Sequence, residues 1–300
     1  MKPLSSVITE NAVCVPTRPV LRYHGGKWKL APWIIDHFPP HNIYVEPFGG
    51  AASILMRKSR SCGEVYNDID GDVVNIFRVL QDPEKANELS KRVSLTAFAR
   101  AEFRAAYGKP SDEIDAAHKM IVRSFMGFGS ASMTRVHVTG FRKNSSRSGT
   151  IPATDWARWP AQIQHFVTRL QGFVIENLDA ISVIRQHDSP STLFYVDPPY
   201  PLSTRSSLKL KNGNRGHYYR YDMTDDAHRA LAAVLHECIG MVLISGYECP
   251  LYDIDLYSGW RRFKRAHYAD GSRPRTEVIW LNAACTTALD RSRCQQRLIA

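Results

Sequence analysis

Short runs of strand-forming residues alternate along the chain with segments of helical periodicity. The runs are rich in Val, Ile, Tyr and Phe, and they predict strands at residues 43–47, 64–67, 173–176, 193–196, 241–245 and 277–281. Amphipathic segments between most of them predict helices over residues 72–80, 180–187 and 224–238. Thr224 suits the N-cap of the last helix. The alternation predicts an α/β protein with a doubly wound, mostly parallel sheet.

One long interval interrupts the alternation. Residues 83–170 contain no convincing strand run, only helical patterns followed by a loop rich in glycine and serine. We interpret this interval as an inserted, mainly helical subdomain, which divides the catalytic domain into residues 21–82 and 171–283. We expect residues 1–20 to form a loosely ordered leader and residues 284–300 a basic C-terminal tail.

Positive charge gathers in two loops that hold no acid. The chain carries a formal net charge of +10, which favours a polyanionic partner. Acids are absent between Asp115 and Asp155 and again over residues 201–221, where aromatic rings lie among the basic residues. Such loops suit a phosphate backbone and unstacked bases. The candidate nucleic-acid contacts are Arg123, Arg135, Arg142, Lys143, Arg147, Arg205, Lys209, Lys211 and Arg215.

Other classes of protein find little support in the sequence. No segment is long and apolar enough to span a bilayer, and the N-terminus lacks the apolar region of a signal peptide. The six cysteines form no CxxC pair, and the histidines show no metal-ligand spacing. We therefore expect a cytoplasmic protein with reduced thiols, no metal, no membrane association and no evident obligate protein partner.

Two strand ends predict a nucleoside pocket. The stretch YVEPFGGAASILMRK, residues 44–58, reads as a strand, a glycine turn and the start of a helix, which lets a ligand approach the backbone. The next strand ends at Asp68, where a carboxylate can accept hydrogen bonds from ribose hydroxyls. RYHGGKWK, residues 22–29, is not a Walker A loop, because Leu21 and Trp28 stand where glycine and Ser or Thr are needed.

A third strand end carries an unusual acid. LFYVDPPY, residues 193–200, places Asp197 directly after a strand that the two prolines must terminate, and then presents Tyr200. Ligands bind at such strand ends in α/β sheets. The stretch therefore predicts a rigid platform of acid and aromatic ring within a site.

The order of these motifs resembles the Dam-like (D12 class) DNA adenine-N6 methyltransferases, within them the branch often encoded by phages and prophages. RYHGGK, VEPFGG, an acid-ended second strand, a basic insertion and DPPY follow one another, and the resemblance covers residues 21–282. It implies a Rossmann-like methyltransferase fold, S-adenosylmethionine as the cofactor and double-stranded DNA, in the bacterial nucleoid, as the substrate. An anti-restriction or restriction-modification role is what the resemblance suggests.

The resemblance also implies roles for individual residues. Lys27, Gly26 and Tyr23 would contact the methionine end of the cofactor, and Asp68 its ribose. The loop beneath it would comprise Glu46, Pro47, Phe48 and Gly49. Asp179 matches a less specific acidic position near the cofactor, and a plain helix N-cap explains it equally well. The catalytic set would be Asp197, Pro198, Pro199 and Tyr200, with Asp197 also near the cofactor.

Adenine chemistry accounts for the acid and the prolines. The lone pair of N6 is delocalised into the ring, so N6 is a poor nucleophile. Hydrogen bonds from N6 to the Asp197 carboxylate and the Pro198 carbonyl would aim that lone pair at the sulfonium methyl. Tyr200 would stack on the adenine, which must be flipped out of the duplex.

Alternative functions remain open from the sequence. The same scaffold could methylate RNA adenine or a protein glutamine, although Asp rather than Asn at position 197 argues against both. A catalytically inactive DNA-binding relative would not need Lys27, Asp68 and Asp197 together. The glycine- and serine-rich loop predicts relaxed sequence specificity; the alternative is that Arg135 or Arg142 pairs with a guanine and enforces a short site such as GATC.

Overall fold

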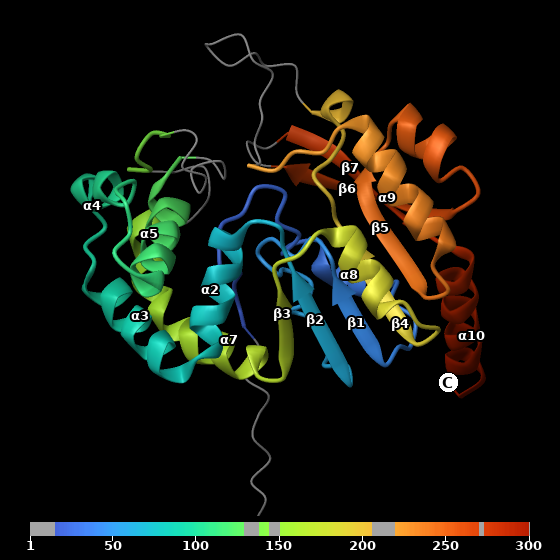
Figure 1. Ribbon diagram of the computed structural model, residues 1–300, viewed down its shortest axis with the longest axis horizontal. Coiled ribbons are helices and arrows are strands. Elements are labelled where there is room, and N and C mark those ends of the chain that lie inside the picture. Colours follow the sequence, from blue (N-terminus) through green and yellow to red (C-terminus); the bar gives the residue numbers. More distant parts are fainter. Residues whose placement is uncertain (1–15, 129–137, 144–150, 206–219, 270–272, 300) are drawn as a thin grey trace, which may run out of the picture.

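The computed structural model describes residues 16–128, 138–143, 151–205, 220–269 and 273–299. Seven strands form one sheet in the order β3-β2-β1-β4-β5-β7-β6 (Figure 1). The strands are β1 (Ile43–Glu46), β2 (Gly63–Asn67), β3 (Phe173–Glu176), β4 (Thr192–Val196), β5 (Met241–Tyr247), β6 (Arg261–Ala269) and β7 (Arg273–Leu281). β1 to β5 pair in parallel, whereas β7 is antiparallel to both β5 and β6. The predicted α/β fold with a mostly parallel sheet is confirmed.

The helices that flank the sheet include the three that the sequence predicts. Those three are α2 (Gly71–Gln81), α8 (Ala180–His187) and α9 (Asp225–Glu237), and the side chains of Asp70, Asp179 and Thr224 accept hydrogen bonds at their N-termini. The short helices are α1 (Ala31–Ile35), a 3₁₀ turn at Leu202–Thr204 and a π-helical turn at Leu251–Leu256. In Figure 1, α8 and α9 lie in front of the sheet.

Residues 83–170 form helices, as predicted for the insertion. These are α3 (Pro83–Leu95), α4 (Arg100–Ala105), α5 (Glu113–Met126), α6 (Pro152–Arg158), a 3₁₀ turn (Pro160–Gln162) and α7 (Ile163–Leu170). Within the described part of this interval the β-structure is an isolated bridge between Gly127 and Phe141. Phe125 and Trp159 belong to the same hydrophobic cluster as Leu193 and Tyr195 of β4. The insertion therefore shares a continuous core with one face of the sheet.

The opposite face of the sheet packs on α8 and α9. Phe194 and Val196 of β4 join Val183 of α8 and Leu231 of α9 in a second cluster. Successive residues of β4 thus point alternately into the two clusters, as the pleat of a strand requires. Burial on both faces explains why this strand is a continuous apolar run in the sequence.

The two ends of the chain differ from expectation. Residues 283–299 form helix α10 rather than a basic tail, and Cys285 and Leu289 are buried on it. Residues 1–15 of the expected leader lie outside the described residues, but residues 16–20 are held in place. Val20 is fully buried, and its carbonyl oxygen accepts a hydrogen bond from Nε1 of Trp159 at 3.0 Å.

Residues 16–27 form a belt that runs from the insertion to the sheet. The Thr17 hydroxyl donates to Gln162 Oε1 at 2.8 Å, beside the start of α7. The Arg22 amide donates to Ser124 Oγ of α5 at 2.7 Å. The belt therefore contacts the insertion at two places, beside the start of α7 and on α5, before it reaches the glycines at positions 25 and 26.

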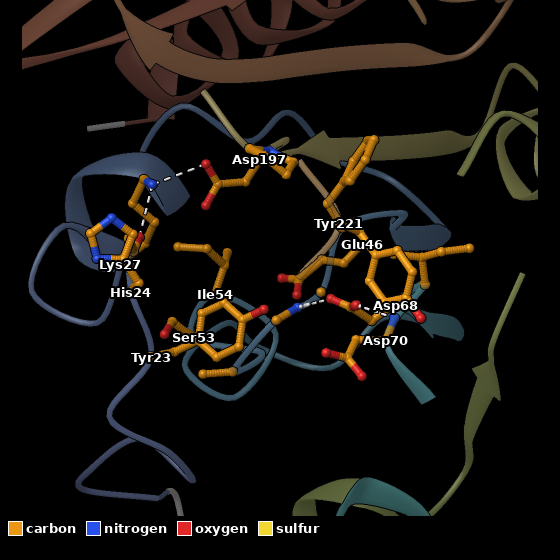
Figure 2. A pocket seen from close by; sticks show the side chains of 18 of the residues that line it. Tyr23, His24, Lys27, Glu46, Ser53, Ile54, Asp68, Asp70, Asp197 and Tyr221 are labelled. Atoms are coloured by element: carbon orange, nitrogen blue, oxygen red, sulfur yellow. Dashed lines mark hydrogen bonds and ion pairs between the residues drawn. The ribbon is translucent and has the colours of Figure 1, made fainter. Parts of the chain in front are cut away.

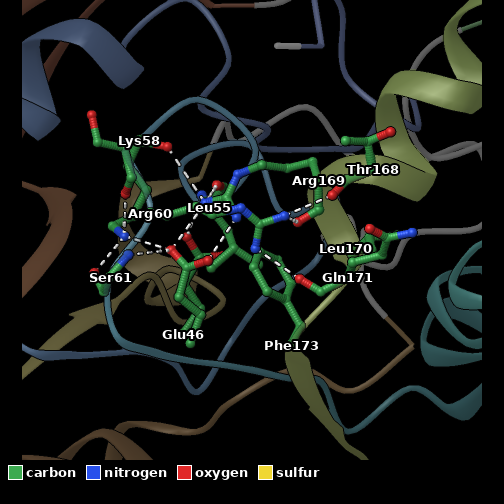
Figure 3. A network of polar contacts seen from close by, with 12 residues as sticks. Glu46, Leu55, Lys58, Arg60, Ser61, Thr168, Arg169, Leu170, Gln171 and Phe173 are labelled. Atoms are coloured by element: carbon green, nitrogen blue, oxygen red, sulfur yellow. Dashed lines mark hydrogen bonds and ion pairs between the residues drawn. The ribbon is translucent and has the colours of Figure 1, made fainter. Parts of the chain in front are cut away.

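A buried ionic network joins the insertion to the amino end of β2 (Figure 3). The carboxylate of Glu64 accepts hydrogen bonds from Lys58 Nζ and from Arg169 Nη1 of α7, both at 2.6 Å. Arg169 Nη2 also donates to the Leu55 carbonyl oxygen at 2.6 Å. Arg60 donates to the carbonyl oxygens of Thr168 and Gln171 at the end of α7. These bonds fix the point at which the chain leaves the insertion for β3.

Candidate active site

A pocket opens at the carboxyl ends of β1, β2 and β4 (Figure 2). The strand order reverses between β1 and β4, which is where ligands bind in open α/β sheets. The lining residues are Tyr23, His24, Gly25, Gly26, Lys27, Glu46, Phe48, Gly49, Gly50, Ala51, Ser53, Ile54, Asp68, Ile69, Asp70, Tyr195, Asp197, Pro199, Arg220 and Tyr221.

Two glycines shape the floor of the pocket after β1. A Cβ on Gly49 would lie 2.2 Å from the ring of Tyr66, so only glycine fits there. Gly50 has a φ of +48°, the left-handed conformation that favours glycine. Ala52 also has a positive φ, of +52°. The expected helix does not form, since residues 47–57 make successive turns instead, and the predicted helix start is therefore wrong.

Glu46 ends β1 as a buried acid. Its Oε1 accepts hydrogen bonds from the Tyr44 hydroxyl at 2.6 Å and from the Leu55 amide at 2.8 Å. Burial raises the pKa of Glu46 to about 8, and these two hydrogen bonds lower it only in part. The position can therefore gain or lose a proton near neutral pH.

Asp68 ties the end of β2 to the glycine turn. Its carboxylate accepts hydrogen bonds from the amides of Gly50 and Asp70, each at 2.8 Å. Burial raises its pKa to about 6, against the opposing effect of those bonds. Asp68 lines the pocket at the carboxyl end of β2.

Lys27, at the end of the belt, contacts the acid that follows β4. It is 5% exposed, and its Nζ donates to the Gly25 carbonyl oxygen at 3.0 Å and to Asp197 Oδ1 at 2.9 Å. The same nitrogen lies 3.6 Å from a Glu277 carboxylate oxygen and 4.7 Å from the centre of the Tyr200 ring. One lysine thus contacts three residues that come from two later parts of the chain.

Asp197, the acid that follows β4, accepts a second hydrogen bond in addition to that from Lys27. The Ser245 hydroxyl of β5 donates to Asp197 Oδ1 at 2.8 Å. Both hydrogen bonds to Asp197 from the described residues therefore use Oδ1, whereas Oδ2 receives neither. Because one oxygen is fixed by two donors, the orientation of the whole carboxylate is set.

Glu277 of β7 is a site residue that sequence reasoning missed. It is 1% exposed and accepts a hydrogen bond from the Tyr200 hydroxyl. Burial raises its pKa to about 7, while Lys27 acts in the opposite direction. The available signal was an acid at the start of the apolar run of residues 277–281, because a buried carboxylate requires a partner.

The structure brings together most of the predicted cofactor residues and excludes others. The pocket lining includes Tyr23, Gly26, Lys27, Glu46, Phe48, Gly49, Asp68, Asp197 and Pro199. Pro47, Pro198 and Tyr200 are not part of it. Asp179 is also outside the lining, and it accepts a hydrogen bond from the Ser182 amide as the N-cap of α8. The cap accounts for its position, as the alternative interpretation had it.

The loop after DPPY returns to the pocket at Arg220 and Tyr221. Arg220 Nη1 lies 3.2 Å from Asp72 Oδ2 and 3.5 Å from Asp70 Oδ1. Sequence reasoning gave no pocket role to Arg220, Tyr221 or Asp70. The basic residue was visible in the acid-free run, but its acidic partners lie some 150 residues earlier in the chain.

The predicted nucleic-acid contacts divide into buried, exposed and undescribed residues. Arg123 is 1% exposed and donates to the Ala106 carbonyl oxygen at 2.5 Å, so its assignment as a DNA contact is corrected to a core role. Arg142 is 8% exposed, and Arg205 pairs with Asp222 at 2.7 Å, whereas Lys143 is exposed. Outside the described residues lie Arg135, Arg147, Lys209, Lys211 and Arg215.

The described residues lack two further kinds of feature, a helix that could cross a membrane and a cluster of metal ligands. None of the helices there combines the length and apolar character needed to cross a bilayer. The same part of the chain holds no group of three or more His, Cys, Asp and Glu side chains placed to bind a metal ion.

Comparison with known proteins agrees with the motif order. A model of the D12 class N6 adenine-specific DNA methyltransferases matches residues 23–262. The chain is 26% identical over 246 residues to the DNA adenine methylase of Escherichia coli K12, covering 78% of this chain and 82% of that protein. The DNA adenine methylase of Vibrio cholerae O1 El Tor is 26% identical over 205 residues, covering 66% and 70%. The chain therefore belongs to the D12 class of N6 adenine-specific DNA methyltransferases.

Proposed function

We propose that the pocket binds S-adenosylmethionine and that Asp197 positions the N6 amine of a flipped adenine in double-stranded DNA for methylation. DNA adenine methylation follows from the family. The observation that carries the residue roles is the convergence of Lys27, Asp68 and Asp197 on one pocket at the strand-order reversal. A DNA-binding relative without catalysis would have no use for that convergence.

The pocket suits the proposed cofactor in shape and in charge. Glycines at positions 25, 26, 49 and 50 let a ligand approach the backbone closely. Asp68 stands where a ribose is bound in related sheets. The acids Asp68, Asp70 and Asp197 give the lining a negative character that favours a sulfonium cation. When bound, the cofactor supplies the electrophilic methyl group.

The geometry around Asp197 supports a role toward the acceptor nitrogen. Lys27 and Ser245 both donate to Oδ1, and we assign Oδ2 as the acceptor of an N6 hydrogen. A positioned carboxylate turns the amine so that its lone pair can face the methyl donor. Two prolines follow Asp197, and each has a restricted φ angle. Pro198 is buried and Pro199 lines the pocket, so the backbone after Asp197 has little freedom to move.

We also propose that the protein has no strict preference for the DNA sequence around the adenine. Phosphate contacts position a protein but carry no sequence information. Residues 127–150 contain a single side chain of the Asn or Gln type, and Arg142 is 8% exposed, which leaves little of its guanidinium to reach a base edge. We propose methylation of adenine in many contexts; recognition of a short site through Arg135 is the alternative.

A methylation assay with two matched variants tests the assignment. Purified protein, unmethylated duplex DNA and methyl-labelled S-adenosylmethionine should yield N6-methyladenine, and Asp197→Ala should abolish it. Asp226→Ala, an exposed acid on α9, is the matched control and should retain full activity. Label recovered only in RNA, in protein or in cytosine would refute the proposal.

Mapping methylated positions in DNA from cells that express the protein addresses specificity. Adenine methylation spread over unrelated contexts would support relaxed recognition. Methylation confined to one short motif at enzyme excess would contradict it and favour a guanine contact in the insertion.

A further inference from the structure

The β6–β7 hairpin presents a basic surface beside the pocket, and none of the predicted DNA contacts lies on it. β6 begins RRFKR, and β7 adds Arg275 near its own start. The hairpin extends past the end of β5, because Tyr247 pairs with Glu277 while β7 begins at Arg273 (Figure 1). Its far part therefore stands beyond the carboxyl ends of the parallel strands, at the level of the pocket.

Strand register divides the basic side chains of the hairpin between two faces. Arg265 lies directly opposite Glu277, and His267 lies opposite Arg275. Opposed residues in an antiparallel pair point to the same face, and so do residues two apart on one strand. Arg265, His267 and Arg275 therefore share the face on which Glu277 contacts Lys27.

Contacts on that face confirm the arrangement. The guanidinium of Arg275 lies 5.6 Å from the ring centre of Tyr247, and the Tyr247 ring meets that of His267 at 6.4 Å. Tyr247 in turn packs edge-on against Tyr200 at 4.8 Å. An unbroken row of rings thus joins the DPPY tyrosine to the basic residues of the hairpin.

The two faces differ in how their charges are paired. On the opposite face, Arg262 pairs with Asp253 at 2.8 Å and Lys264 pairs with Glu248. Within the described part of the chain, neither Arg265 nor Arg275 has an ion pair with a carboxylate. Burial lowers the pKa of His267, and the positive charges of Lys27 and Arg275 lower it further. Arg261 lies on the same face by register but pairs with Asp290 at 2.7 Å, at the other end of β6. The uncompensated positive charge beside the pocket is therefore that of Arg265 and Arg275, and His267 contributes a hydrogen-bonding ring rather than a charge.

We propose that Arg265, His267 and Arg275 form a phosphate-binding ledge that holds the DNA backbone next to the flipped nucleotide. A flipped adenine stays attached to its two flanking phosphates, so the backbone must pass the mouth of the pocket. Unpaired guanidinium groups are suited to bind phosphate oxygens there. The ledge rests on the proposed function and adds to it a DNA contact outside the insertion.

Two double variants that remove the same charge test the ledge. Arg265→Gln with Arg275→Gln should weaken binding of a labelled duplex roughly tenfold at about 100 mM salt, and it should reduce the slope of log K against log salt by about 1.8, for two phosphates. Arg262→Gln with Lys264→Gln, on the opposite face, should leave both nearly unchanged. Equal effects of the two double variants would overturn the ledge.

Further measurements separate the possible causes of a loss. Binding of S-adenosylmethionine by calorimetry should be the same in wild type and in both double variants, since no ledge residue lines the pocket. Arg265→Lys with Arg275→Lys should restore the salt slope, because lysine also binds phosphate as a point charge; failure to restore it in a folded variant counts against the ledge. Wild-type protein that neither binds nor methylates duplex DNA would refute the proposed function itself, whereas an active wild type with indistinguishable double variants refutes the ledge alone.

Discussion

Two buried networks of charge stand at opposite ends of the same sheet, and they contain opposite ratios of cations to carboxylates. At the amino end of β2, Lys58 and Arg169 both bind the single carboxylate of Glu64. At the carboxyl ends, Lys27 lies within 4 Å of two carboxylates, those of Asp197 and Glu277, and no second Lys or Arg of the described residues pairs with either of them. The first network has positive charge in excess, and the second has negative charge in excess.

The pKa shifts follow this difference. Burial acts to raise the pKa of Glu64, but hydrogen bonds from Arg169 and Lys58 hold it below its usual value. Burial raises the pKa of Glu277 to about 7, and the one nearby lysine offsets it only in part. A buried carboxylate with sufficient partners stabilises the fold, whereas one with too few leaves a site that a cationic ligand can complete.

The largest expected effect is on stability at the amino end of β2. Arg169→Met should lower the free energy of unfolding by about 3–5 kcal/mol, because it leaves the buried Glu64 with one of its two cations. Chemical denaturation measures the loss. Arg158→Met, at an exposed position of α6, is the control and should change stability little. A loss below about 1 kcal/mol for Arg169→Met would show that Lys58 alone suffices.

The second effect concerns catalysis at the other network. Asp197→Ala should reduce kcat by ~10²-fold or more, since a positioned electrostatic acceptor is lost. Its thermal stability should fall much less than that of Arg169→Met, because the network keeps the carboxylate of Glu277 beside Lys27. Retention of more than about a tenth of wild-type turnover would contradict the assignment.

The third effect concerns the cofactor. Asp68→Ala should weaken binding of S-adenosylmethionine by roughly 1.5–3 kcal/mol if a charged acceptor of ribose hydrogen bonds is removed. Calorimetric titration gives the value directly. Glu84→Ala is the control, because Glu84 is an exposed acid in the first turn of α3 that does not line the pocket. Unchanged affinity in Asp68→Ala would place the ribose elsewhere.

The smallest effect is a change in pH dependence. The pKa of Glu46 is raised to about 8 by burial, so the folded state holds an extra proton between its usual pKa and pH 8, and stability falls as pH rises through that range. Glu46→Gln keeps an oxygen for the Tyr44 and Leu55 donors and should raise stability by about 1–2 kcal/mol above pH 8. Denaturation curves from pH 5 to pH 9 should converge at the acid end; parallel curves would contradict this prediction.

Apolar runs predicted the sheet well, except at its edge. Strands buried on both faces have a continuous apolar sequence, which is why β4 and β5 were found within two residues of their ends. β6 was missed because it is an edge strand with charged residues on both faces, so its sequence shows no apolar run. Local composition cannot reveal a strand that is stabilised mainly by backbone hydrogen bonds to β7.

The site was predictable where it follows strand ends and not where it depends on tertiary contacts. Glu46, Asp68 and Asp197 all come directly after or at the end of apolar strands, so their sequence positions were informative. Glu277 reaches Lys27 and Tyr200 only because β7 lies antiparallel beside β5, which the sequence does not show. Arg123 was misassigned because a run of basic residues carries no information on which of them is buried.

The belt at residues 16–27 limits how the insertion could be exchanged between related proteins. The belt is hydrogen-bonded to Trp159 and Ser124 of the insertion, and Lys27 follows Arg22 by five residues, a span of at most about 18 Å. A chimaera that received residues 83–170 from another protein would keep a belt fitted to the wrong helices. The part that would have to be exchanged is therefore discontinuous in sequence. A chimaera with new DNA recognition must take both the belt and the insertion from the same protein.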